Sequence, residues 1–148
     1  MRSVLSILSI ALLFSCNSSD PKKEAAEKRA NQPVAVDCYR YATANDTIAL
    51  QLTRVNGYYT GMLEYKLKEK DRNSGTLQGS MKGDLFIGDY TFESEGMKSI
   101  REVVFKKDGD GFVEGYGDVE TLNNRVKFKN TDSLQFNNSM KLALVSCQ

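Results

Sequence analysis

The sequence predicts an all-β protein, a single antiparallel up-and-down β-barrel of about eight strands, and three observations predict it. From Val34 onward, β-branched and aromatic residues alternate with polar residues, which is the period-two pattern of half-buried strands. Asn-Gly and Asp-Gly pairs separate these runs, as hairpin turns do. The first 33 residues lack the alternation, so we expect one β domain over residues 34–148.

The most distinct element is a hairpin over residues 47–67. In residues 47–55 the apolar side chains of Ile48, Leu50 and Leu52 fall on one face of a strand. Asn56-Gly57 then supplies the two residues with positive φ that a type I′ turn requires. Residues 58–67 return as the second strand.

Further runs predict seven more strands, which brings the candidates to nine: residues 36–41, 75–82, 85–93, 99–107, 112–119, 125–129 and 142–147. Two of the connections, residues 82–84 and 108–111, contain Gly and Asp in the manner of tight turns. Strands that follow one another along the chain should therefore pair as a meander.

Glycines inside the predicted strands favour a barrel over a flat sheet. They weaken strand pairing but permit the sharp coiling that a small barrel needs, and they stand at Gly61, Gly79, Gly88, Gly115 and Gly117. Closure also removes exposed sheet edges. The alternative is a two-sheet β-sandwich with the same strand order.

Residues 1–15 are typical of an export signal peptide. An apolar run from Val4 to Phe14 follows a lone basic residue, Arg2. The run is well short of the roughly 20 residues that cross a bilayer. We therefore expect it to be removed from the mature protein.

Leu13-Phe14-Ser15-Cys16 resembles the bacterial lipobox. Leu13, Ser15 and Cys16 match the pattern, whereas Phe14 stands where a smaller residue is usual. The resemblance implies that cleavage precedes Cys16 and that its thiol carries acyl chains such as palmitate, which anchor the protein in a membrane. Asn17 replaces the aspartate that often signals inner-membrane retention, which implies the outer membrane, on its periplasmic side or at the cell surface. The alternatives are an ordinary secretory peptide and an uncleaved anchor.

Residues 16–33 are expected to form the lipidated N-terminus and a tether. They mix Ser, Asn, Lys, Glu and Ala without a periodic apolar pattern, so they cannot bury enough surface to fold alone. Asp20-Pro21 suits the start of a short helix. A flexible linker is the other interpretation.

Lipidation of Cys16 would leave two cysteines, Cys38 in the first predicted strand and Cys147 in the last. Export to an oxidising compartment favours a disulfide between them. A closed loop of about 100 residues stabilises by roughly 4.7 kcal/mol in the chain-entropy model. Two free thiols are the alternative. A metal pair is less favoured, because two sulfurs make only half of a tetrahedral zinc site.

Composition excludes several classes of function. The formal net charge is +1, with 20 basic and 19 acidic residues, whereas nucleic-acid binding needs a basic excess. The chain contains no histidine, which excludes histidine-dependent triads and removes the commonest ligand for transition metals. We expect no metal, no cofactor and no enzymatic activity.

A polar group on neighbouring strands is the candidate site for a ligand or a structural cluster: Glu93, Glu95, Arg101, Glu102 and Glu114. By alternation Arg101 shares a face with Val103 and Phe105, and Glu114 shares one with Phe112 and Tyr116. If both point inward they form a buried ion pair or line a small polar cavity at one mouth of the barrel. A pair of catalytic carboxylates is the alternative.

Four segments, 38–41, 69–75, 90–96 and 114–117, resemble a group of small bacterial lipoproteins with a lipocalin-like β-barrel and no known activity. We expect a non-enzymatic binding or interaction module of the cell envelope. Its expected partners are the membrane, through Cys16, and an envelope protein, a glycan or a small apolar ligand, with no nucleic acid. The alternatives are a carboxylate-dependent hydrolase of envelope glycans, a lysozyme-inhibitor-like protein or an envelope sensor, and a structural spacer.

Overall fold

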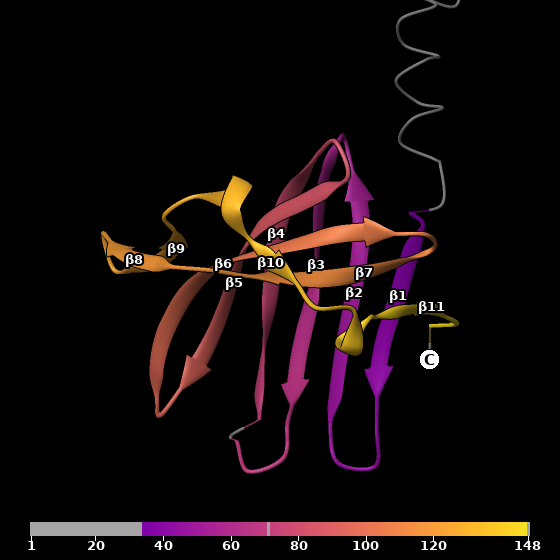
Figure 1. The fold of residues 1–148 in the computed structure, drawn as a ribbon, viewed down its shortest axis with the longest axis horizontal. Coiled ribbons are helices and arrows are strands. Elements are labelled where there is room, and N and C mark those ends of the chain that lie inside the picture. The colour runs from indigo at the N-terminus through magenta and orange to yellow at the C-terminus, as the bar shows by residue number, and fades with distance from the viewer. Residues whose placement is uncertain (1–33, 71, 148) are drawn as a thin grey trace, which may run out of the picture. The chain divides into compact units, whose positions relative to one another are not determined.

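The computed structural model describes residues 34–70 and 72–147 as one β-sheet (Figure 1). Its strands are β1 (Val36–Ala42), β2 (Thr47–Val55), β3 (Tyr58–Lys66), β4 (Asn73–Lys82), β5 (Leu85–Ser94), β6 (Met97–Asp108), β7 (Gly111–Tyr116), β8 (Val119–Leu122), β9 (Arg125–Phe128), β10 (Gln135–Phe136) and β11 (Ala143–Val145). Two short 3₁₀ turns, η1 (Thr131–Ser133) and η2 (Asn138–Met140), interrupt the C-terminal segment. The all-β prediction is confirmed. The signal peptide, the lipidated Cys16 and the tether lie outside the described residues.

The predicted meander is confirmed from β1 to β7. Each of these strands pairs antiparallel with the next one along the chain. The β2–β3 turn has the predicted geometry, because Asn56 and Gly57 have φ values of 51° and 89°. The side chains of Ile48, Leu50 and Leu52 are buried, and the residues between them face the other side.

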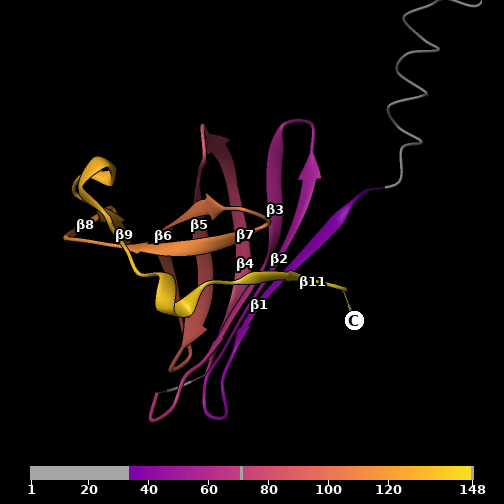
Figure 2. The same cartoon turned by 45° about the vertical axis from the view of Figure 1, so that its right-hand side comes forward.

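The predicted closed barrel is wrong, and so is the two-sheet sandwich. The path of paired strands ends at β10, beside β7, and at β11, beside β1. Between them, one isolated bridge joins Phe112 to Leu142. Figure 2 shows the C-terminal segment crossing from the region of β9 toward β1. Since η1 and η2 break this segment into pieces of two and three paired residues, it cannot form the continuous strand that closure requires.

The region predicted as one strand over residues 112–119 is two strands. β7 ends at Tyr116, and β8 begins at Val119 and forms a hairpin with β9. Asn123 and Asn124 make the turn of this hairpin with positive φ. β9 then runs parallel to β6 at two residue pairs, so the sheet is mixed.

Glycines on the inner face allow the sheet to coil sharply. A Cβ on Gly61 would overlap the carbonyl oxygen of Gln51 on the neighbouring strand, and one on Gly79 would overlap that of Ile87. These positions therefore require the absence of a side chain. The predicted role of the strand glycines holds at both.

Coiling brings strands that are distant in the sheet face to face. The rings of Tyr39 on β1 and Phe112 on β7 meet edge to face with centroids 4.9 Å apart. A single apolar cluster fills the inner side of the coiled sheet: Ile48, Leu50, Leu52, Leu63, Tyr65, Leu77, Phe86, Tyr90, Val103, Phe105, Phe112 and Leu142. The interior is therefore a packed core.

Substituting Gly61→Ala should lower the free energy of unfolding by about 2 kcal/mol, because the added methyl group meets backbone and cannot be relieved by a rotamer change. Urea unfolding measures the effect. The control is Thr60→Ala, an exposed position on the same strand, which should cost less than about 1 kcal/mol. Equal losses for the two variants would contradict the argument.

Candidate functional site

A buried carboxylate lies at the centre of the interior polar group. Glu114, on β7, is only 6% exposed and faces β3 across the core. Its Oε1 accepts a 2.6 Å hydrogen bond from the hydroxyl of Tyr65, and its Oε2 accepts a 3.0 Å bond from the hydroxyl of Tyr116. Both oxygens of the carboxylate thus have a tyrosine partner.

Arg101, on β6, lies on the inner face with Val103 and Phe105, where it contacts aromatic rings. Its guanidinium carbon is 5.7 Å from the ring centroid of Tyr65 and 6.0 Å from that of Tyr90, within the range of a cation–π interaction. No salt bridge of the described residues joins it to Glu114. The predicted direct ion pair is therefore not formed. Arg101 lies against the rings of Tyr65 and Tyr90, and its positive charge favours the ionised form of Glu114 from that distance.

Burial controls the protonation of this cluster. Desolvation raises the pKa of Glu114, while the hydrogen bond from Tyr65, the charge of Arg101 and the hydrogen bond from Tyr116 oppose the rise. Burial and the neighbouring carboxylate raise the pKa values of Tyr65 and Tyr116. Burial raises the pKa of Tyr90 to about 12, and its hydroxyl has no hydrogen-bond partner among the described residues. All three tyrosines stay protonated, and Tyr65 and Tyr116 donate to Glu114.

Glu102 lies on the opposite face of β6 from Arg101. It stands directly across from Asp89 on β5, and Arg125 on β9 forms ion pairs with both carboxylates. Glu102 also accepts a 3.0 Å hydrogen bond from the backbone N–H of Phe128. These contacts, made on the outer face of β6, hold the β8–β9 hairpin beside that strand.

The remaining two residues of the predicted group stand apart from it. Glu93 is exposed and pairs across the β5–β6 hairpin with Lys98. Glu95 is exposed in the turn of that hairpin, with φ at 52°. Of the five predicted residues, the structure brings together only Arg101 and Glu114.

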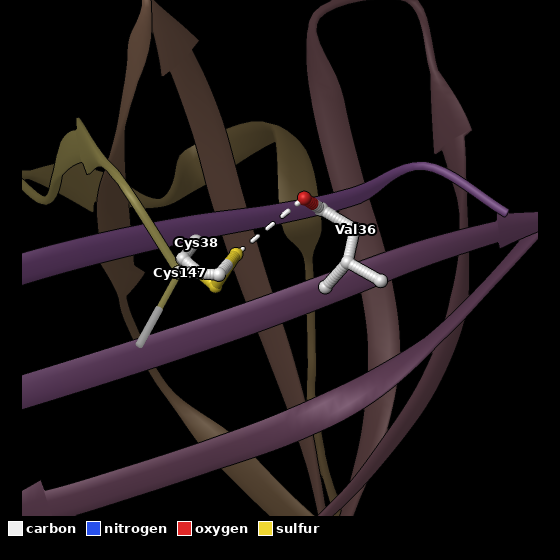
Figure 3. The surroundings of a disulfide bond; sticks show 3 residues. All are labelled: Val36, Cys38 and Cys147. Carbon is white, nitrogen blue, oxygen red and sulfur yellow. Dashed lines mark hydrogen bonds between the residues drawn. A yellow bond between two sulfur atoms is a disulfide. The ribbon is translucent and has the colours of Figure 1, made fainter. Parts of the chain in front are cut away.

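The predicted disulfide is present between Cys38 on β1 and Cys147 (Figure 3), with the Cα atoms 5.3 Å apart. The Sγ of Cys147 also lies 3.5 Å from the carbonyl oxygen of Val36. Because β11 pairs with β1 over only three residues, the covalent link supports a short ladder. It secures the C-terminal segment to the first strand.

A hollow of about 390 Å³ lies beside the disulfide, chiefly on the outer face of the first strands. Its lining is Cys38, Tyr39, Arg40, Ala49, Leu50, Gln51, Met62, Glu64, Ser74, Val145 and Ser146. In the ladder, Ala49 lies directly between Arg40 on β1 and Glu64 on β3. One short side chain between two long ones leaves the depression.

Sequence analysis did not predict this hollow or the ion pairs of Asp89 and Arg125. The one available signal was Ala49, the smallest outward residue in a strand whose other outward side chains are Thr47, Gln51, Thr53 and Val55. Its meaning depends on which residues of the neighbouring strands stand beside it. That register is a property of the fold.

Within residues 34–70 and 72–147, no helix is long and apolar enough to span a bilayer, and no group of three or more acidic or cysteine side chains is placed to hold a metal ion. Comparisons with protein-family models, with curated proteins and with solved structures find no match to this chain.

The buried Glu114 should make stability depend on pH. Its pKa in the folded protein is raised above the ordinary value of 4.5, so the folded state holds the proton after the unfolded state has released it. Its contribution to stability is therefore fully present below pH 4.5 and is lost as the pH rises through the folded-state pKa. Urea unfolding of the native protein and Glu114→Gln across this range measures the difference.

Relative to Glu114→Gln, the native protein should lose stability as the pH rises above about 4.5. Glu93→Gln is the control, since Glu93 is exposed. A difference between the native protein and Glu114→Gln that is independent of pH would contradict the assignment.

Proposed function

We propose that this protein is a lipid-anchored lipoprotein of the bacterial cell envelope that acts as a non-enzymatic binding module. The observation that carries the binding proposal is the hollow beside Ala49. Its volume falls in the range of about 300–1,000 Å³ that is typical of small-molecule sites. It also combines apolar side chains with a few polar groups, as such sites do.

The envelope assignment is supported by two independent features of the chain. Leu13-Phe14-Ser15-Cys16 resembles a lipobox, with an apolar run of signal-peptide length before it. The Cys38–Cys147 disulfide suits an oxidising compartment such as the periplasm or the cell surface. The outer membrane is favoured by Asn17, because aspartate at this position is the usual retention signal for the inner membrane.

The lining of the hollow favours a small amphipathic ligand that carries an anionic group. Met62, Ala49 and Val145 offer apolar surface. Glu64 is engaged by Arg72, with 2.7 Å between Nε and Oε1. Arg40 forms no ion pair with another described residue, so its charge is available to a ligand.

The carboxylate-hydrolase alternative finds less support. Glu114 and Tyr65 are buried against the packed core, at 6% and 8% exposed, so the carboxylate offers little surface to a substrate, although its other partner, Tyr116, is 43% exposed. Asp89 and Glu102 are neighbours, but Arg125 lies between their carboxylates, in the space that a glycoside and a water molecule would need.

Metabolic labelling tests the anchor. Bacteria that express the full-length protein with a radiolabelled palmitate supply should incorporate label into it, and the protein should sediment with the outer membrane. Cys16→Ser should abolish the label, whereas Cys38→Ser, which leaves Cys16 intact, should retain it. Label that persists in Cys16→Ser would overturn the lipoprotein assignment.

Fluorescence titration tests the hollow, with anilinonaphthalene sulfonate as an apolar probe that carries one anion. Because the core and the disulfide lie within residues 34–147, a chain of residues 17–148 retains them and avoids a lipid background. Ala49→Phe should weaken binding by about tenfold, or ~1.4 kcal/mol, by filling the hollow. Arg40→Gln should weaken it less.

The matched control is Thr121→Phe, which adds the same ring to an exposed position on β8, a strand that does not line the hollow. Its binding should equal that of the native chain. Unchanged binding in both Ala49→Phe and Arg40→Gln, with native circular dichroism, would contradict the binding proposal without affecting the anchor.

A further inference from the structure

Four exposed apolar side chains gather at the end of the sheet where the described chain begins. Val34, Val36, Val55 and Tyr58 are 61%, 40%, 44% and 69% exposed. Val36 pairs with Thr53, and Val55 pairs with Tyr58. Val34 lies two residues before Val36, just outside the paired part of β1. We call these four residues the N-terminal apolar patch.

The register places Val36, Val55 and Tyr58 on one face. Ile48, Leu50 and Leu52 point into the core, so Thr53 and Val55 point outward, and their ladder partners share that face. Figure 1 shows the start of β1 and the β2–β3 turn at the same end of the sheet. The patch is therefore contiguous, unlike the isolated exposed apolar residues that are normal on a protein surface.

The charge around this turn differs from that of the three hairpin turns between β4 and β7. Residues 53–60 contain Arg54 and no carboxylate. The β4–β5, β5–β6 and β6–β7 turns each carry acidic residues, at Asp84, Glu95, and Asp108 and Asp110 respectively. A turn with a tyrosine, a valine, one cation and no carboxylate suits the headgroup region, where tyrosine is enriched and anionic lipids repel acidic side chains.

We propose that the N-terminal apolar patch lies against the lipid surface to which the protein is anchored. This inference rests on the proposed lipidation of Cys16, which lies 34 − 16 = 18 residues before Val34. Such a tether spans at most about 60 Å when extended. Linkage on this scale gives an effective concentration on the order of millimolar, so a patch with weak affinity of its own would still be held at the surface.

Contact at the patch would also orient the domain. The hollow shares the outer face of β2 with Val55, and its nearest lining residue on that strand, Gln51, is four residues away. At a rise of about 3.3 Å per residue, this separation is roughly 13 Å. An amphipathic molecule that leaves the bilayer would thus find the hollow close to the headgroups.

Tryptophan fluorescence tests the contact, because the natural chain contains no tryptophan. Tyr58→Trp places a single probe in the patch. Met97→Trp is the matched control, because Met97 is 67% exposed and stands at the β5–β6 turn. In the antiparallel meander the β2–β3 and β4–β5 turns lie at one end of the strands, and the β5–β6 turn lies at the other end. Each full-length, lipidated variant is incorporated into phosphatidylethanolamine–phosphatidylglycerol vesicles with and without brominated acyl chains.

Brominated lipid should quench the fluorescence of Tyr58→Trp by about half, as expected for a side chain at the headgroup–acyl boundary, and should leave that of Met97→Trp nearly unchanged. Adding Val55→Asp to Tyr58→Trp should restore the fluorescence. If both variants float with the vesicles but Tyr58→Trp is quenched no more than Met97→Trp, the patch proposal is wrong and the anchor stands. If the protein does not float, the anchor itself fails, and the proposal falls with it.

Discussion

The close approach of neighbouring strands on the inner face of the sheet is the constraint on which the other features depend. Gly61 and Gly79 allow backbone to lie where a side chain would otherwise stand, and the sheet coils as a result. Coiling places β7 opposite β1 and β3, so that Phe112 reaches Tyr39 and Glu114 reaches Tyr65. Without this curvature a meander of seven strands would leave its apolar face in water, because no helix of the described chain covers it.

Glu114 shows what the coiled sheet tolerates in its core. A buried carboxylate is costly unless its oxygens are hydrogen-bonded, and here two tyrosine hydroxyls satisfy them. The positive charge of Arg101 lies one tyrosine ring away and lowers the remaining cost. Because the hydroxyl of Tyr65 comes from β3 and the carboxylate from β7, their hydrogen bond forms at only one alignment of these two strands. A shift of β7 by one residue would turn Glu114 to the other face and leave Val113 opposite the hydroxyl of Tyr65.

Period-two alternation was sufficient to predict the strands from β1 to β7, their order and the apolar residues that share a face with Arg101 and with Glu114, because these are local properties of the chain. The two cysteines were likewise sufficient for the disulfide. Closure was predicted wrongly because the η1 and η2 turns are brief features of a polar segment with little periodicity. The ion pairs of Asp89 with Arg125 and the hollow beside Ala49 escaped prediction, since both depend on which strands become neighbours.

The disulfide links the chemistry of the compartment to the geometry of the hollow. Val145 and Ser146 line one side of it, yet they belong to a strand of three residues and its continuation at the end of the chain, and so short a ladder is marginal in water. The bond from Cys147 to Cys38 holds them against β1. In a reducing environment this side of the hollow would fray, since little else fixes it. The hollow is therefore complete only where thiols are oxidised, which is also the kind of compartment that we propose for the protein.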